Sequence, residues 1–155
     1  MPNVIEGGIS GVGLRFAVVF SRYNDFITNR LLDAAVEALL QSGAGDKDID
    51  VFKVPGSFEL PQMARKVAMT GRYHAIICLG ALIRGKTRHF EIISDECARG
   101  IQDVAGDFGL PVTFGVITAD TMEQAMERAG EKSENKGWEA AMAAIEMANS
   151  YRRVQ

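Results

Sequence analysis

The chain has 155 residues, of which 47% are hydrophobic and 24% charged, a composition typical of one globular domain that buries about 70% of its unfolded surface. Its 17 basic and 20 acidic residues leave a formal net charge of -3 and form no long run of either sign, which disfavours binding to nucleic acid or to an anionic membrane surface. The N-terminus lacks a signal-peptide pattern and no apolar run reaches membrane length, so we expect a cytoplasmic protein.

The first residues predict an extended arm followed by a strand and a helix. Residues 1–14 contain four glycines, too many for a helix, and they offer too few apolar positions for a core strand. We expect a strand over Arg15–Phe20 and then a helix whose apolar residues recur at helical spacing from Ile27 to Leu40. Gly43 or Gly45 is expected to end that helix.

A second strand and helix follow. Residues Ile49–Val54 form a short apolar run that ends at a Pro55-Gly56-Ser57 turn. We expect a helix over Phe58–Thr70, because a proline at position 61 is tolerated in the first turn of a helix and a glycine lies just past its end.

The third unit carries the most distinctive stretch of the chain. Residues Ala75–Ile83 are a continuous apolar run, typical of a strand buried on both faces. The basic, glycine-containing loop Arg84–His89 follows, and apolar residues then recur at helical spacing from Phe90 to Phe108. Backbone N–H groups at a helix start, a glycine and basic side chains together favour an anion site in this loop.

The last part of the chain predicts one more strand and two helices. The strand is expected over Val112–Ile117. Thr121, with Gln124 three residues later, matches a capping box for a helix that ends near Gly130, and the last helix is expected over Trp138–Tyr151.

The alternation of four short strands with helices predicts an α/β domain over residues 1–155, with a parallel sheet covered by helices on both faces. Ligands of such sheets bind outside the carboxyl ends of the strands. Polar residues or glycines stand at these ends, in the segments 21–24, 55–59, 84–89 and 118–120. Cys78 and Cys97 look like buried thiols of a reducing compartment, and the two histidines of the chain are too few for a zinc site.

Six segments of the sequence, in their order and at their separations, resemble the lumazine synthase family over about residues 13–149. They are SRYNDFIT, VPGSFELP, GALIRGKTRHFEII, PVTFGVIT, EQAMERAG and NKGWEAAMAAIEMAN. The resemblance implies a flavodoxin-like, three-layer α/β/α fold with a central four-stranded parallel sheet. It also implies the condensation of 5-amino-6-(D-ribitylamino)uracil with 3,4-dihydroxy-2-butanone 4-phosphate, through an imine, loss of phosphate and ring closure with release of water. This penultimate step of riboflavin biosynthesis needs no cofactor.

The resemblance assigns several residues to the pyrimidine. Tyr23 stands where the family has an aromatic ring, usually Phe or Trp, stacked on the pyrimidine, although a tyrosine at a strand end also serves a core. The main chain of Leu82 and Ile83 is implied to bind the pyrimidine edge, and both residues are otherwise core. Phe114 and Lys136 are implied to line the pocket. Without the resemblance, they would be a core phenylalanine and a solvated loop lysine.

A second group is implied to hold the ribityl chain. Gly56, Ser57, Phe58 and Glu59 match the turn whose backbone groups, small residue and carboxylate bind the ribityl hydroxyls. The alternatives are an ordinary turn and, for Glu59, a partner for the helix dipole. Asn24 is implied to bind the ribityl chain or the backbone, and asparagine at a strand exit is also a common helix cap.

A third group is implied to bind phosphate and move protons. Gly85, Lys86 and Thr87 match the phosphate loop, where the main-chain N–H groups and the threonine hydroxyl contact the anion, although the Lys86 charge can equally face solvent. Arg128 matches the phosphate-binding arginine, and on its own it would be an exposed helix residue. His89 matches the proton-transfer residue, and its ordinary pKa near neutral suits a general acid or base.

The resemblance also implies an assembly. In the family, the equivalents of Phe114, Arg128 and Lys136 come from the subunit next to the one that supplies Tyr23, Glu59 and His89. We therefore expect a homo-oligomer built from pentamers, with small-molecule substrates bound between adjacent subunits. The resemblance leaves open a single pentamer, a decamer and a hollow icosahedral shell of twelve pentamers. The alternative is a relative that binds riboflavin or a lumazine without turnover, or a protein that mainly forms a cage.

Overall fold

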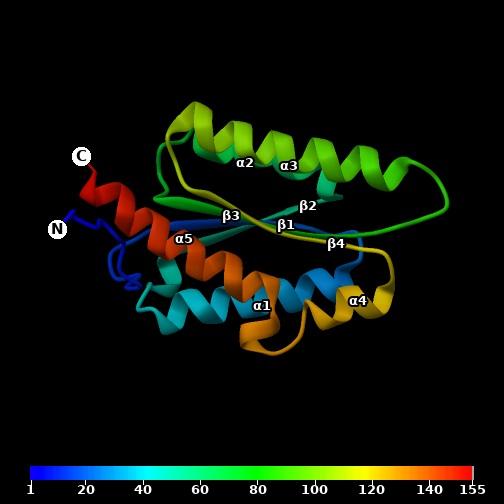
Figure 1. Cartoon of the computed structure of the whole chain (residues 1–155), viewed down its shortest axis with the longest axis horizontal. Helices are drawn as coiled ribbons and strands as arrows, with labels where there is room; N and C mark the ends of the chain where they lie inside the picture. The colour runs from blue at the N-terminus through cyan, green and yellow to red at the C-terminus, as the bar shows by residue number, and fades with distance from the viewer. Residues whose placement is uncertain (155) are drawn as a thin grey trace.

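A computed structural model, which describes residues 1–154, has one four-stranded parallel sheet between two layers of helices (Figure 1). This is the flavodoxin-like, three-layer α/β/α fold that the sequence predicts. The strands are β1 (Phe16–Ser21), β2 (Ile49–Val54), β3 (Ala75–Ile83) and β4 (Val112–Ala119). The helices are α1 (Asp25–Gln41), α2 (Leu60–Ala68), α3 (His89–Phe108), α4 (Met122–Glu127) and α5 (Lys136–Arg153), with single 3-10 turns η1 (Asp46–Asp48), η2 (Ser57–Glu59) and η3 (Lys132–Glu134).

The sheet separates two hydrophobic cores. Helices α2 and α3 cover one face, and α1, α4 and α5 cover the other (Figure 1). Because side chains alternate along a strand, Ala17 and Val19 of β1 face α2 and α3, whereas Phe16, Val18 and Phe20 pack toward α1 and α5. Every residue of β1 and the first seven of β3 are buried, which explains why these strands read as unbroken apolar runs.

The strand order places the carboxyl ends of three strands together. The order is β2-β1-β3-β4, so the chain moves outward in one direction from β1 to β2 and in the other from β3 to β4. Doubly wound sheets leave a crevice where the order reverses, and here that point lies between β1 and β3. The end of β2 lies beside it, because Ser21 pairs with Val54.

Some helix boundaries differ from the predicted ones because side chains accept hydrogen bonds from the backbone N–H groups at the helix starts. The predicted helix from Phe58 begins as the turn η2 and becomes α-helical at Leu60. The last helix begins at Lys136, since Asn135 Oδ1 accepts hydrogen bonds from the N–H groups of Gly137 and Trp138.

The capping box predicted at Thr121 forms only in part. Thr121 Oγ1 accepts from the Gln124 N–H at 3.2 Å. Gln124 Oε1, however, accepts from the N–H of Asp120 at 2.9 Å, one residue earlier than a capping box requires.

The N-terminal arm lies along the last helix. Asn149 Nδ2 donates to the carbonyl oxygens of Gly8 and Ser10, each at 2.9 Å, and Arg153 Nη1 donates to that of Glu6 at 2.9 Å. These contacts bring the two ends of the described chain together (Figure 1).

The two cysteines are unpaired and buried. Cys78 lies in β3 and Cys97 in α3, and both belong to the core between this helix and the sheet. Burial raises the pKa of the Cys97 thiol to about 12, and it also raises the pKa of Cys78. Among residues 1–154, no helix is long and apolar enough to cross a membrane.

Candidate active site

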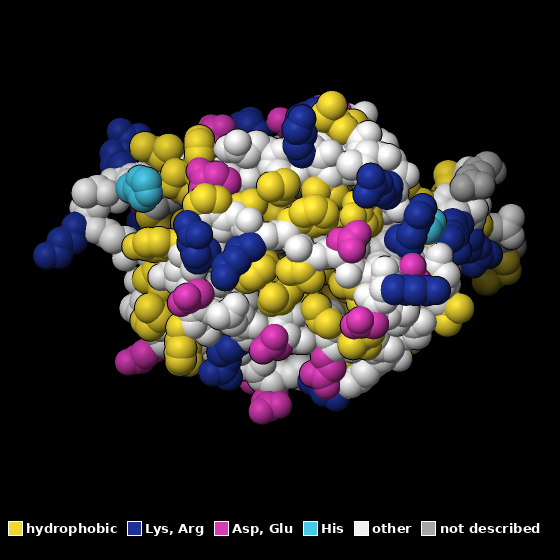
Figure 2. All heavy atoms as spheres, turned by 180° about the vertical axis from the view of Figure 1, so that it is seen from behind, with side chains coloured by type: hydrophobic (Ala, Val, Ile, Leu, Met, Phe, Trp, Pro, Cys, Tyr) yellow, Lys and Arg dark blue, Asp and Glu magenta, His cyan; other side chains and the backbone are white. Residues whose placement is uncertain are grey.

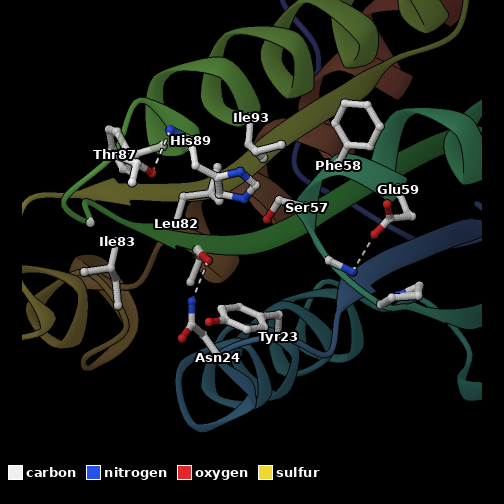
Figure 3. Close-up of a pocket in the computed structure, with 15 residues that line it drawn as sticks. Tyr23, Asn24, Ser57, Phe58, Glu59, Leu82, Ile83, Thr87, His89 and Ile93 are labelled. Carbon is white, nitrogen blue, oxygen red and sulfur yellow. Dashed lines mark hydrogen bonds between the residues drawn. The ribbon is translucent and has the colours of Figure 1, made fainter.

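The main pocket of the described chain opens at the carboxyl ends of β1, β2 and β3 and has a volume of about 690 Å³. Its walls come from the β1 exit, the turn η2, the β3 exit and the start of α3 (Figure 3). The lining residues are Tyr23, Asn24, Pro55, Gly56, Ser57, Phe58, Glu59, Ala81, Leu82, Ile83, Gly85, Thr87, His89, Phe90 and Ile93.

Tyr23 and Asn24 form the wall at the β1 exit. The Tyr23 N–H donates to the Pro55 carbonyl at 2.9 Å, which joins this exit to that of β2, and the tyrosine side chain is 70% exposed. Asn24 has a left-handed backbone (φ 64°), and its Nδ2 donates to the Ala81 carbonyl at 2.9 Å. Asn24 stands at the N-cap of α1, but its side chain makes no capping hydrogen bond. Of the two roles that the sequence left open, the side chain takes a backbone contact, which joins the exits of β1 and β3.

The turn η2 forms the opposite wall. Glu59 Oε1 accepts from the Gly56 N–H at 2.9 Å, and the Glu59 N–H donates to the Gly56 carbonyl at 3.2 Å. This pair of bonds closes the turn and fixes the carboxylate at the pocket rim (Figure 3). Ser57 is 5% exposed, whereas the Phe58 ring is half exposed.

His89 lies where the basic loop enters α3. Its N–H donates to Thr87 Oγ1 at 3.2 Å, and its imidazole ring points into the pocket (Figure 3). The loop backbone from Gly85 to Thr87 lies at the same end of the pocket. An imidazole beside a helix N-terminus can exchange a proton with a bound molecule while the nearby N–H groups face an anion.

Carboxylates hold Arg84, the first charge of this loop. Its Nε lies 2.8 Å from Asp120 Oδ1, its Nη1 pairs with Glu91, and its guanidinium lies 4.7 Å from the centre of the Phe90 ring. A hydrogen bond from the backbone of Glu91 and the Arg84 guanidinium lower the pKa of the Glu91 carboxyl. Arg84 therefore fastens the loop between β3 and α3, and its charge is already balanced.

Comparison with known proteins assigns this architecture to a family. The family model described as 6,7-dimethyl-8-ribityllumazine synthase matches residues 13–152. The chain belongs to the lumazine synthase family.

Three curated relatives bear that name. The protein of Syntrophus aciditrophicus is 54% identical over 154 residues, which cover 99% of this chain and 100% of the relative. That of Desulfatibacillum aliphaticivorans is 54% identical over 149 residues, which cover 96% of each chain. That of Desulfosudis oleivorans is 55% identical over 149 residues, which cover 96% of this chain and 95% of the relative.

The pocket brings together most of the residues that the resemblance to lumazine synthases singles out. Those that line it are Tyr23, Asn24, Gly56, Ser57, Phe58, Glu59, Leu82, Ile83, Gly85, Thr87 and His89. They come from three strand exits that are far apart in the sequence, and the switch point of the sheet makes them neighbours.

Four of the predicted residues lie outside this pocket. Lys86 is exposed in the loop, and Phe114 is 42% exposed on the edge strand β4. Arg128 follows α4, where its Nη1 lies 3.5 Å from the Thr118 carbonyl, and Lys136 Nζ lies 3.4 Å from Glu139 Oε1. Within one chain, no side chain at these four positions reaches the main pocket.

Four lining residues were absent from the predicted set. They are Pro55, Ala81, Phe90 and Ile93. Phe90 and Ile93 are spaced by three residues at the start of α3, so both lie on the same face of the helix. Their apolar character suggested only a core-facing stripe, because the sequence does not reveal that this stripe extends beyond the end of the sheet.

Proposed function

We propose that this chain condenses 5-amino-6-(D-ribitylamino)uracil with 3,4-dihydroxy-2-butanone 4-phosphate to give 6,7-dimethyl-8-ribityllumazine, with release of phosphate and water. The observation that carries the proposal is the convergence in one pocket of an aromatic ring, a turn with a serine and a carboxylate, a glycine-containing loop at a helix start, and a histidine. Each of these features meets one requirement of the two substrates. The family and the curated relatives support the same reaction.

The walls formed by β1 and η2 suit the ribitylated pyrimidine. The exposed Tyr23 ring offers a flat apolar surface for stacking, and the backbone at Leu82 and Ile83 offers hydrogen-bonding groups to the edge of the base. The carboxylate of Glu59, held by the Gly56 N–H, accepts hydrogen bonds from ribityl hydroxyls. Ser57 provides a further hydroxyl partner.

The loop end of the pocket suits the phosphate ester. The loop from Gly85 to Thr87 leads into the start of α3, where the helix dipole favours an anion. His89 lies next to this loop and moves protons as the imine forms and the phosphate leaves. Much of the rate is expected to come from holding two substrates in register.

We further propose that the site is completed by an adjacent subunit of a pentamer in the cytoplasm. Phe114, Arg128 and Lys136 are placed away from their own pocket, so a neighbouring chain would supply them. Hydrophobic side chains gather in the middle of the face shown in Figure 2, with charged side chains around them. In the chain as a whole, large hydrophobic residues such as Tyr23, Phe26, Val51 and Phe58 are exposed. A surface of this kind favours association between copies.

Mixing the two substrates with the purified protein tests the reaction directly. We expect an increase in lumazine absorbance that scales with protein concentration and exceeds the rate without protein. Each substrate alone serves as the control. A protein that binds ribitylaminouracil without any such change would be a carrier, and the proposed reaction would be wrong.

A further inference from the structure

A buried hydroxyl lies behind the turn that lines the pocket. Ser21 ends β1, is 0% exposed, and its Oγ has no hydrogen-bond partner among the described residues. Buried hydroxyls in folded proteins are usually paired. Among residues 1–154 the side-chain hydroxyls of Ser21, Thr28 and Ser94 are buried without a partner, and that of Ser21 stands beside Gly80, next to Ser57 of the pocket wall. The five residues before Ser21 in β1 are all apolar, and packing alone would be served equally well by alanine.

Gly80 opens the space into which this hydroxyl faces. It lies in β3 among residues of the α2 and α3 side of the sheet, between Cys78 and Leu82. A Cβ atom on Gly80 would lie 2.7 Å from Ser57 Oγ and 3.2 Å from Ser21 Oγ. Both hydroxyls therefore border the same small volume, which any larger side chain at position 80 would occupy.

The two serines differ in their access to the pocket. Ser57 lines it, whereas Ser21 is fully buried and is not among the lining residues. A hydroxyl can accept one hydrogen bond while it donates another. If Ser21 donates to Ser57 Oγ, the Ser57 proton is directed outward, toward an oxygen in the pocket.

We propose that Ser21 is a positioning residue, which orients the Ser57 hydroxyl toward the ribityl chain across the space that Gly80 leaves open. The hydrogen bond between the Ser21 and Ser57 hydroxyls forms directly after a rotamer change of Ser57, or one water molecule beside Gly80 bridges the two hydroxyls. This inference rests on the proposed function of the pocket. It adds that the Ser57 hydroxyl selects for the ribityl chain because a buried residue behind the pocket wall orients it.

Equilibrium binding tests the proposal without requiring turnover. Calorimetry compares 5-amino-6-(D-ribitylamino)uracil with 5,6-diaminouracil, the same base without its ribityl chain. We expect Ser21→Ala to weaken binding of the ribitylated compound by about three- to tenfold, the range for one hydrogen bond, and to leave binding of the bare base unchanged. Gly80→Ala should act in the same direction, because its methyl group would displace Ser57 Oγ.

A double variant distinguishes positioning from a separate contact. If Ser21 acts through Ser57, then Ser21→Ala combined with Ser57→Ala should weaken binding no more than Ser57→Ala alone. Thr28→Val is the matched control, because it removes another buried hydroxyl without a partner, on the inner face of α1. It should leave both affinities unchanged. Thermal unfolding of every variant reports whether it is folded.

Several results would overturn the proposal. They are unchanged ribityl binding in Ser21→Ala, an equal loss for the bare base, or additive losses in the double variant. Because Ser21→Ala removes a single oxygen, its result stands even where Gly80→Ala fails to fold. The wild-type absorbance assay distinguishes failure of the proposed reaction from failure of the proposed role of Ser21. If the wild type shows no turnover and Ser21→Ala still weakens binding of the ribitylated compound alone, the reaction is contradicted and the role of Ser21 is supported.

Discussion

At the scale of single residues, the two histidines form a natural pair for comparison. His89 points into the pocket, whereas His74 lies at the opposite end of β3 and accepts a hydrogen bond from the Arg15 N–H at 2.8 Å. We expect His89→Ala to lower kcat by up to about 10²-fold, the low end of what acid–base catalysis contributes, because positioning is retained.

The control for that variant is His74→Gln, which should keep the wild-type kcat at saturating substrate. Steady-state rates at several pH values measure both. A full rate in His89→Ala would show that this imidazole does not shuttle protons.

His74 should make stability depend on pH. Its partial burial, and then the charges of Arg152 and Arg15, lower the pKa of His74 below the ordinary value of 6.5. The folded state therefore binds its proton more weakly than the unfolded state does. The stabilising contribution of neutral His74 to the free energy of unfolding is complete above about pH 6.5. It is lost as the pH falls through the lowered pKa. Urea unfolding at pH 8 and pH 5.5 should show a larger loss for wild type than for His74→Gln.

At the scale of the elements, Asn24 joins two strand exits with one side chain. We expect Asn24→Gly to destabilise the protein by about 1 kcal/mol, through loss of the bond to the Ala81 carbonyl. Asn24→Ala should lose about 2 kcal/mol, because alanine also disfavours the left-handed backbone at this position. Urea unfolding compares them, and equal losses would show that the backbone conformation contributes nothing.

The order and type of the strands and long helices could be predicted from local patterns. The buried runs of β1 and β3 are apolar along their whole length because helices cover both faces. The sequence pattern could not distinguish the short turn η2 from the first turn of α2. The turn is closed by a hydrogen bond between the Glu59 side chain and the Gly56 backbone, which local helical spacing does not reveal. The position of Asn24 between two strands likewise depends on the sheet order.

At the scale of the whole molecule, the proposed site needs two chains. A variant that lacks Glu59 and one that lacks Arg128 would damage opposite halves of the site. When Glu59→Ala and Arg128→Ala are denatured and refolded together, some interfaces receive an intact Glu59 from one chain and an intact Arg128 from the other. We expect activity to return in the mixture and not in either variant refolded alone.

Refolded mixtures without recovered activity would place both residues in one chain or outside the site. Sedimentation of the same samples checks that they assemble. This test matters because no pattern within one sequence shows where a neighbouring subunit lies. Phe114 on β4 and Lys136 on α5 lie outside the pocket of their own chain and would reach one only in the proposed assembly, whereas the residues at the exits of β1, β2 and β3 meet within a single chain.

The burial of β1 and β3 on both faces also determines how the site exchanges with solvent. Amide hydrogens in these strands should exchange for deuterium only when the whole domain opens, whereas those in the exposed loop between β3 and α3 exchange through local fluctuations. The pocket thus has a floor that stays fixed for as long as the protein is folded. Beside it, the segment proposed to hold phosphate can open and close many times without disturbing that floor.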